Sequence, residues 1–78
     1  MTVYIAVTTY ISFMEGTSRE VHGVFTTPEK ADQCLRNQPG FERAEFTRMF
    51  EWLREYDGEL SVYYQIVPTK LDEELQLT

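Results

Sequence analysis

The stretch VYIAVTTYISF, residues 3–13, alternates in a way that predicts a long β-strand. Successive side chains of a strand point to opposite faces, so one face would carry β-branched and aliphatic residues and the other would carry Tyr4 and Tyr10. Eleven residues is long for a strand in so short a chain, and the content is β-branched and aromatic. We therefore expect this strand at the centre of a sheet, with a partner on each edge.

The next residues predict a hairpin and a helix. A polar loop at residues 14–18 leads to a second strand over residues 19–26. Thr27 and Pro28 then form a typical helix start, because threonine caps free backbone amides and proline at the first helical position loses no hydrogen bond. The helix is predicted to run over residues 28–37.

The second half of the chain predicts another helix and a last strand. Large apolar residues recur at helical spacing over residues 43–56, which indicates a second helix. Residues 59–67 alternate again and predict a third strand. The apolar residues of the second helix are Phe46, Met49, Phe50, Leu53 and Tyr56.

These elements predict an α+β fold in the order β-β-α-α-β. A helical crossover after the hairpin would return the last strand beside the first, which gives a three-stranded antiparallel sheet of order 2-1-3 with two helices on one face. A chain of 78 residues is short enough for a single domain, which we place at residues 1–70. Residues 71–78 form an expected acidic tail.

The composition restricts the class of partner. The chain has 13 acidic and 7 basic residues, a net charge of −6, and residues 42–78 hold nine of the acids and four of the bases. Such a surface repels phosphate backbones and suits a partner with a basic surface, or it only keeps the chain dispersed. The single Cys34 favours a reducing cytoplasm, and no segment is apolar enough to span a bilayer.

Few residues indicate chemistry. His22 has no metal-ligand partner at suitable spacing, so we expect it to face water from its strand. Cys34 lies on the apolar stripe of the first helix, where thiols are usually inert, and a Cys34–His22 dyad is the one conceivable catalytic pair. We expect no catalytic activity, no metal and no cofactor.

Two groups of residues are candidates for an interaction surface. Three tyrosines would share the sheet face away from the helices, where they form an interface or simply pack across neighbouring strands. The second group lies on and just after the second helix, where a tryptophan stands among carboxylates. The first group is Tyr4, Tyr10 and Tyr63, and the second is Glu51, Trp52, Glu55 and Glu59.

Several short motifs resemble a family of functionally uncharacterised proteins of phages, prophages and bacteria. They are VYI at residues 3–5, HGVFTTPEKA at 22–31, PGF at 39–41, and YQI at 64–66 followed by LDEE at 71–74. The resemblance implies a hairpin, a helix that starts in the second motif, and a last strand that ends in Leu-Asp. Residues 42–60 depart from the family and look like an insertion.

The expected function is that of a small, acidic, non-enzymatic interaction module in the cytoplasm. The resemblance implies a mobile-element context, so the module is predicted to be an inhibitor or modulator, encoded by a phage or mobile element, of a nucleic-acid-handling host protein of the CRISPR or restriction type. The alternative is a homodimer with a housekeeping role that binds through the tyrosine face. Neither function involves direct contact with nucleic acid or a membrane.

Overall fold

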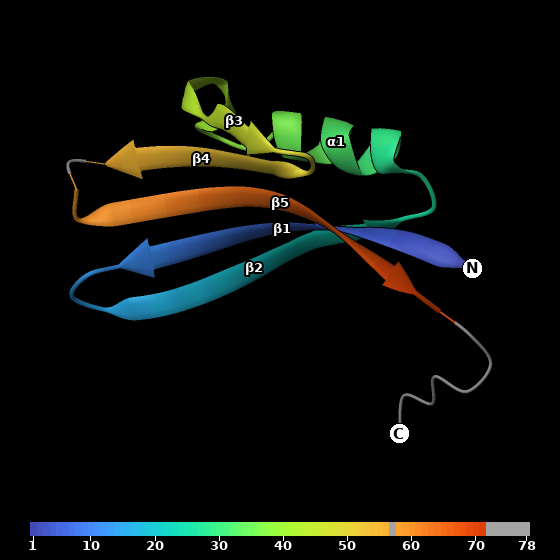
Figure 1. Cartoon of the computed structure of the whole chain (residues 1–78), viewed down its shortest axis with the longest axis horizontal. Coiled ribbons are helices and arrows are strands. Elements are labelled where there is room, and N and C mark those ends of the chain that lie inside the picture. The colour runs from blue at the N-terminus through green and yellow to red at the C-terminus, as the bar shows by residue number, and fades with distance from the viewer. Residues whose placement is uncertain (57, 72–78) are drawn as a thin grey trace.

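The sheet is built around β1 (Thr2–Ser12). The structure is a computed structural model that describes residues 1–56 and 58–71, and in it β1 pairs with β2 (Gly16–Phe25) on one edge and with β5 (Leu60–Lys70) on the other. The far edge of β5 pairs with β4 (Glu51–Tyr56), and β4 pairs with β3 (Glu45–Arg48). The described residues thus form a five-stranded antiparallel sheet of order β2-β1-β5-β4-β3 (Figure 1).

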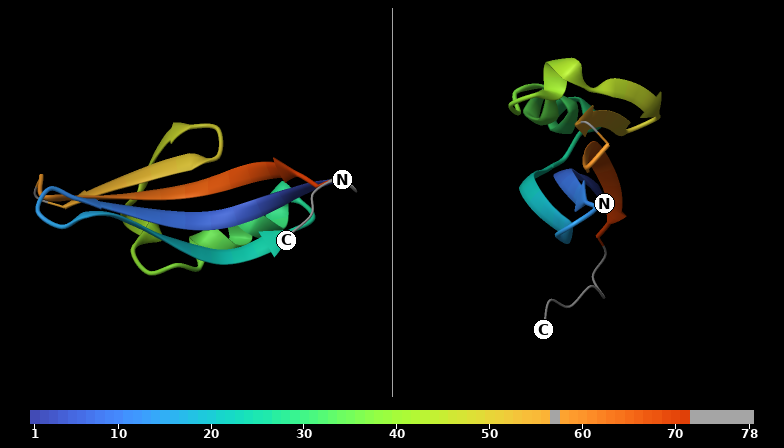
Figure 2. Two further views of the ribbon diagram at one scale, coloured as in Figure 1. Left: turned by 90° about the horizontal axis from the view of Figure 1, so that it is seen from below. Right: turned by 90° about the vertical axis from the view of Figure 1, so that its left-hand side faces the viewer.

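The connection between β2 and β3 contains the helix α1 (Pro28–Arg36) and the 3-10 turn η1 (Phe41–Arg43). Both lie on the same side of the curved sheet (Figure 2). The hydroxyl of Thr27 accepts a hydrogen bond from the backbone N–H of Lys30 at 3.3 Å, which satisfies one of the free amides of the first turn. The predicted helix start at Pro28 is confirmed.

The predicted second helix over residues 43–56 is wrong, and so is the α+β class with a three-stranded sheet and two helices. The described chain is mostly sheet with a single α-helix, because β3 and β4 occupy most of this segment. Phe46 lies opposite Trp52 in the β3–β4 hairpin, and β4 supplies hydrogen-bond partners to an edge of β5 that a helix would leave unpaired. Pairing between strands therefore outweighs the helical spacing of the apolar residues.

Small residues decide which face of β1 meets the helix. Ala6 lies opposite Gly23 of β2, and α1 packs over this part of the sheet with Ala31 and Leu35 fully buried. The small side chain of Ala6 lets the helix approach closely, while the ring of Phe25 lies over Gly23 and joins the core. The helix therefore covers the face of Ala6.

The expected tyrosine face is corrected by this arrangement. Tyr4 and Tyr10 share the face of Ala6 and pack against the core beneath α1. Tyr63 lies opposite Thr9 and so points to the other side of the sheet. We call that side the helix-free face, and on β1 it carries Val3, Ile5, Val7, Thr9 and Ile11.

Phe41 connects the helical layer to the second hairpin. Its side chain is 7 % exposed, and its ring centroid lies 5.3 Å from those of Trp52 and Tyr64. The hydroxyl of Tyr64 donates a hydrogen bond to the backbone carbonyl of Pro39 at 3.0 Å, which fixes the loop before η1. The aromatic cluster thus joins α1, η1, β4 and β5 into one core.

Two further predictions concern the C-terminal tail and membrane-spanning segments. Of the predicted acidic tail at residues 71–78, only Leu71 lies within the described residues, and its backbone N–H donates to the carbonyl of Met1 at 2.7 Å. The helices of the described chain are too short and too polar to span a bilayer.

Candidate functional site

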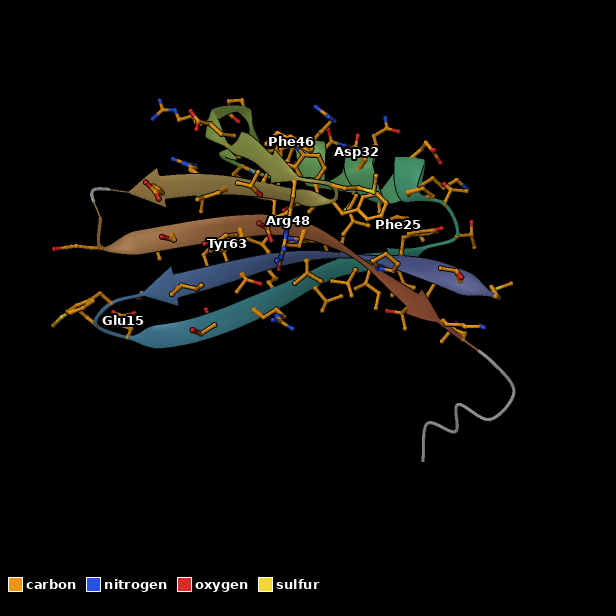
Figure 3. The ribbon with its side chains drawn as sticks, viewed as in Figure 1. Glu15, Phe25, Asp32, Phe46, Arg48 and Tyr63 are labelled. Carbon is orange, nitrogen blue, oxygen red and sulfur yellow. The ribbon has the colours of Figure 1, made fainter. Side chains whose placement is uncertain are left out.

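A groove of about 410 Å³ runs between α1 and the β3–β4 hairpin. Its floor is formed by Trp52 of β4 and Ile66 of β5, the helix forms one wall, and the hairpin forms the other. Figure 3 shows Asp32 of α1 and Phe46 of β3 beside each other at the top of the molecule. We call this feature the helix–hairpin groove, and its lining residues are Pro28, Glu29, Asp32, Phe46, Met49, Phe50, Trp52 and Ile66.

The hairpin wall exposes large apolar side chains. Phe46 is 66 % exposed and Met49 is 76 % exposed. The ring of Phe46 meets the ring of Trp52 edge-on, with centroids 6.2 Å apart. Exposed apolar side chains beside a hollow are typical of contact sites for another molecule.

The turn that presents this wall has an unusual backbone. Phe50 has a φ of 66°, a left-handed conformation that is rare for a bulky residue. Its carbonyl accepts a hydrogen bond from the N–H of Ile66 at 2.9 Å, and its ring packs edge-on against Tyr4 at 6.3 Å. These contacts hold Phe50 in a conformation that costs about 1–3 kcal/mol elsewhere, and such strain tends to occur at binding sites.

The helix wall of the groove is acidic. Glu29 lies in the first turn of α1 and is exposed, while Asp32 pairs with Arg36 across one turn at 2.7 Å. The guanidinium of Arg36 then lies over the rings of Phe41 and Trp52, at 5.4 and 5.9 Å from their centroids. The groove thus combines an aromatic floor with carboxylates on one rim.

The helix-free face carries a polar network around Glu51. One carboxylate oxygen accepts hydrogen bonds from Gln65 at 3.0 Å and Arg48 at 3.2 Å, and the other accepts from Thr47 at 2.7 Å. The hydroxyl of Thr9 donates to the amide oxygen of Gln65 at 3.3 Å. The bonds from Thr47 and Gln65, followed by the charge of Arg48, lower the pKa of Glu51 below its ordinary value.

Replacing Glu51 by glutamine is expected to reduce stability at neutral pH by about 1 kcal/mol, because a neutral amide accepts these bonds less strongly and brings donors that face other donors. The folded state lowers the pKa of Glu51 below 4.5, so this contribution is present above that pH and is lost as the pH falls through the folded pKa. Urea denaturation over a pH series measures the effect.

The matched control is Glu55→Gln, an exposed carboxylate on the same strand and face. Its stability should stay within about 0.5 kcal/mol of the wild type. A difference between Glu51→Gln and the wild type that persists unchanged into acid would contradict the role given to this network.

The structure separates the residues that were expected to act together. Trp52 lies on the helix side of the sheet, whereas Glu51 and Glu55 lie on the helix-free face, because neighbours on a strand point in opposite directions. Glu59 is exposed in the β4–β5 turn. Of the expected interaction residues, Trp52 is the one that lines the groove.

Phe46, Met49 and Phe50 form the hairpin wall of the groove, which the sequence did not identify as a site. At helical spacing they indicated a buried stripe, whereas Phe46 and Met49 are exposed and Phe50 is half-buried. The available signal was Trp52, which lies off that stripe. In the hairpin Met49 and Phe50 form the turn, where Met49 reaches the surface and Phe50 packs against Tyr4.

His22 and Cys34, the residues considered for catalysis or metal binding, make contacts within the fold. His22 is half-buried rather than facing water, and its Nε2 lies 2.5 Å from the hydroxyl oxygen of Thr8, which is 1 % exposed. Cys34 is half-buried and packs against the core cluster. Over residues 1–56 and 58–71, no group of three or more His, Cys, Asp or Glu side chains is arranged to hold a metal ion.

Comparisons of the chain with protein-family models, with curated proteins and with solved structures found no match. The resemblance to a phage and bacterial family therefore stays a prediction, and neither a phage origin nor an inhibitory role gains support.

Proposed function

We propose that the chain is a protein-binding module whose helix–hairpin groove takes an apolar side chain from a basic segment of a partner protein. The observation that carries this proposal is the pair of exposed residues Phe46 and Met49 beside an aromatic floor. Aromatic residues and methionine are enriched where proteins bind one another, and they supply most of the binding energy.

The volume and the charge of the groove support this occupant. About 410 Å³ is within the range of sites that enclose a ligand group, and it is large enough for one or two bulky side chains. Glu29 on the opposite wall would attract lysine or arginine next to the apolar anchor, beside the Asp32 that is paired with Arg36, and the net charge of −6 would steer a basic segment towards the chain.

Trp52 is the single tryptophan of the chain and lies on the groove floor, so it reports binding directly. The probe is a short peptide with a central phenylalanine flanked by lysines, without tryptophan. We expect saturable changes in Trp52 emission with this peptide, and about tenfold or greater weakening when glutamates replace the lysines. Higher salt should weaken binding of the lysine peptide.

Labelled-peptide anisotropy then compares two variants that remove an exposed phenylalanine. Phe46→Ser should weaken binding by about tenfold to a hundredfold, because it removes a hot-spot side chain at the rim of the groove. Phe13→Ser removes a phenylalanine that is 87 % exposed in the β1–β2 turn and should leave binding unchanged. Equal affinities for the two variants, or for the lysine and glutamate peptides, would overturn the proposal.

Non-catalytic binding is part of this proposal, and the reducing cytosol indicated by the single Cys34 is its expected setting. The tyrosine face expected for a homodimer is divided, since Tyr4 and Tyr10 pack against the core on the helix side of the sheet while Tyr63 lies on the other side. Action on a nucleic-acid-handling protein stays a prediction for the basic partner.

A further inference from the structure

We propose that the helix-free face holds a second site, which binds a small organic anion with a carboxylate or phosphate group. A hollow of about 410 Å³ lies on this face, on the opposite side of the sheet from the helix–hairpin groove. We call it the arginine hollow, and its polar lining is Thr9, Thr17, Arg19, Arg48, Glu51, Tyr63 and Gln65. The proposal does not depend on the function of the groove.

The register of the sheet brings two arginines from opposite edges to this hollow. Arg19 of the edge strand β2 lies opposite Thr9, which lies opposite Tyr63 of β5. Arg48 ends the other edge strand, β3, one row away. Figure 3 shows the side chain of Arg48 extending from β3 across β5 towards β1, above the region of Tyr63.

The arginine hollow has more hydrogen-bond donors than the protein itself uses. Arg48 is 77 % exposed and gives one guanidinium nitrogen to Glu51, although the group carries five N–H donors. Arg19, Thr17 and Tyr63 make no side-chain hydrogen bond or ion pair with the rest of the described chain. The carboxylate of Glu51 is already held by Thr47, Arg48 and Gln65. The donors of Arg19 and the remaining donors of Arg48 are therefore available to a ligand in the hollow.

The local charge is opposite to that of the whole chain. Two arginines and one paired carboxylate leave the hollow positive, within a chain of net charge −6. A polyanion such as nucleic acid would meet repulsion beyond the hollow, whereas a small anion would contact only the positive region. Guanidinium groups bind carboxylates and phosphates in bidentate geometry, and Ile11 together with the ring of Tyr63 gives the hollow an apolar side.

The test is an NMR titration of the intact chain with phenyl phosphate, with 3-phenylpropionate, and with the neutral control 3-phenylpropanol. We expect saturable amide shifts at Thr9, Arg19 and Tyr63 with at least one anion at millimolar concentration, and no saturable shifts there with the alcohol. The tighter of the two anions identifies the phosphate or the carboxylate class. Equal shifts with the alcohol, or no saturation with either anion, would overturn the proposal.

Three glutamine variants complete the test. Arg19→Gln and Arg48→Gln should each weaken binding of the anion by about tenfold, since each removes one charged donor group. The control is Lys30→Gln, which removes the same charge from the exposed face of α1 and should retain wild-type affinity. The site would be contradicted if Lys30→Gln lost as much affinity for the anion as the arginine variants. It would also be contradicted if Arg19→Gln kept wild-type affinity. Thermal denaturation of each variant checks that the fold is retained.

Discussion

Replacing Phe41 by alanine is expected to destabilise the protein by about 3–5 kcal/mol, the range found when a buried phenylalanine is truncated. Phe41 is 7 % exposed and packs between Trp52 and Tyr64, with both ring centroids at 5.3 Å. The variant would remove both aromatic contacts and the platform under the guanidinium of Arg36. A chain of this length has a total stability of about 4–12 kcal/mol, so much of the population would unfold at moderate urea.

The comparison variant for this change is Phe13→Ala, the same truncation at a side chain that is 87 % exposed. Its free energy of unfolding should lie within about 0.5 kcal/mol of the wild type. Urea denaturation followed by far-ultraviolet circular dichroism measures both variants. If Phe41→Ala cost no more than Phe13→Ala, the aromatic cluster would not hold η1 to the sheet as described.

Replacing Leu35 by alanine is expected to cost about 2–5 kcal/mol. Leu35 is fully buried, and with Ala31 it forms the contact between α1 and the sheet. Truncation would leave a cavity beside Ala6 and Ala31, whose methyl groups are too small to fill it. We therefore expect a value in the upper part of this range.

Gln33→Ala on the exposed side of the same helix provides the reference. Alanine is the better helix former, so this change should be neutral or slightly stabilising. The free energies of unfolding of the two variants separate burial from helix propensity. A Leu35→Ala variant as stable as Gln33→Ala would show that α1 is not packed on the sheet through this residue.

Local signals in the sequence predicted the first half of the fold well. Alternation over residues 3–13 identified β1, and Thr27 with Pro28 marked the helix start, because both signals arise from neighbours in the chain. The pairing of β1 with β2 and with the last strand also agrees with the order expected for those three strands.

The second hairpin was missed because its stability depends on pairing with β5, the next strand in the sequence, and not on its own residue spacing alone. Residues 43–56 satisfy a helical spacing, and only the edge of β5, which follows in the sequence, makes a strand the better structure. The prediction of which sheet face packs against the helix was wrong for a related reason. Tyr4 and Tyr10 were placed away from the helices because they alternate with the aliphatic residues of β1, yet α1 packs on the face of Ala6, which is set by the register of the sheet.

The candidate site was predictable only in part. Trp52 was identified as a surface aromatic, and it does line the groove, but its expected neighbours Glu51 and Glu55 lie on the opposite face. The arginine hollow was not predicted. Arg19 and Arg48 are far apart in the sequence, and only the strand order places them on the same face.

The position of β5 has a consequence for how the chain acquires its structure. β5 follows the other four strands in the sequence and yet lies between β1 and β4. During synthesis on the ribosome, the β1–β2 and β3–β4 hairpins emerge first and have no shared partner until residues 60–70 leave the exit tunnel. Assembly is therefore governed by contacts between remote segments, which slows folding, and a nascent chain that ends before β5 would expose two unpaired strand edges to other chains.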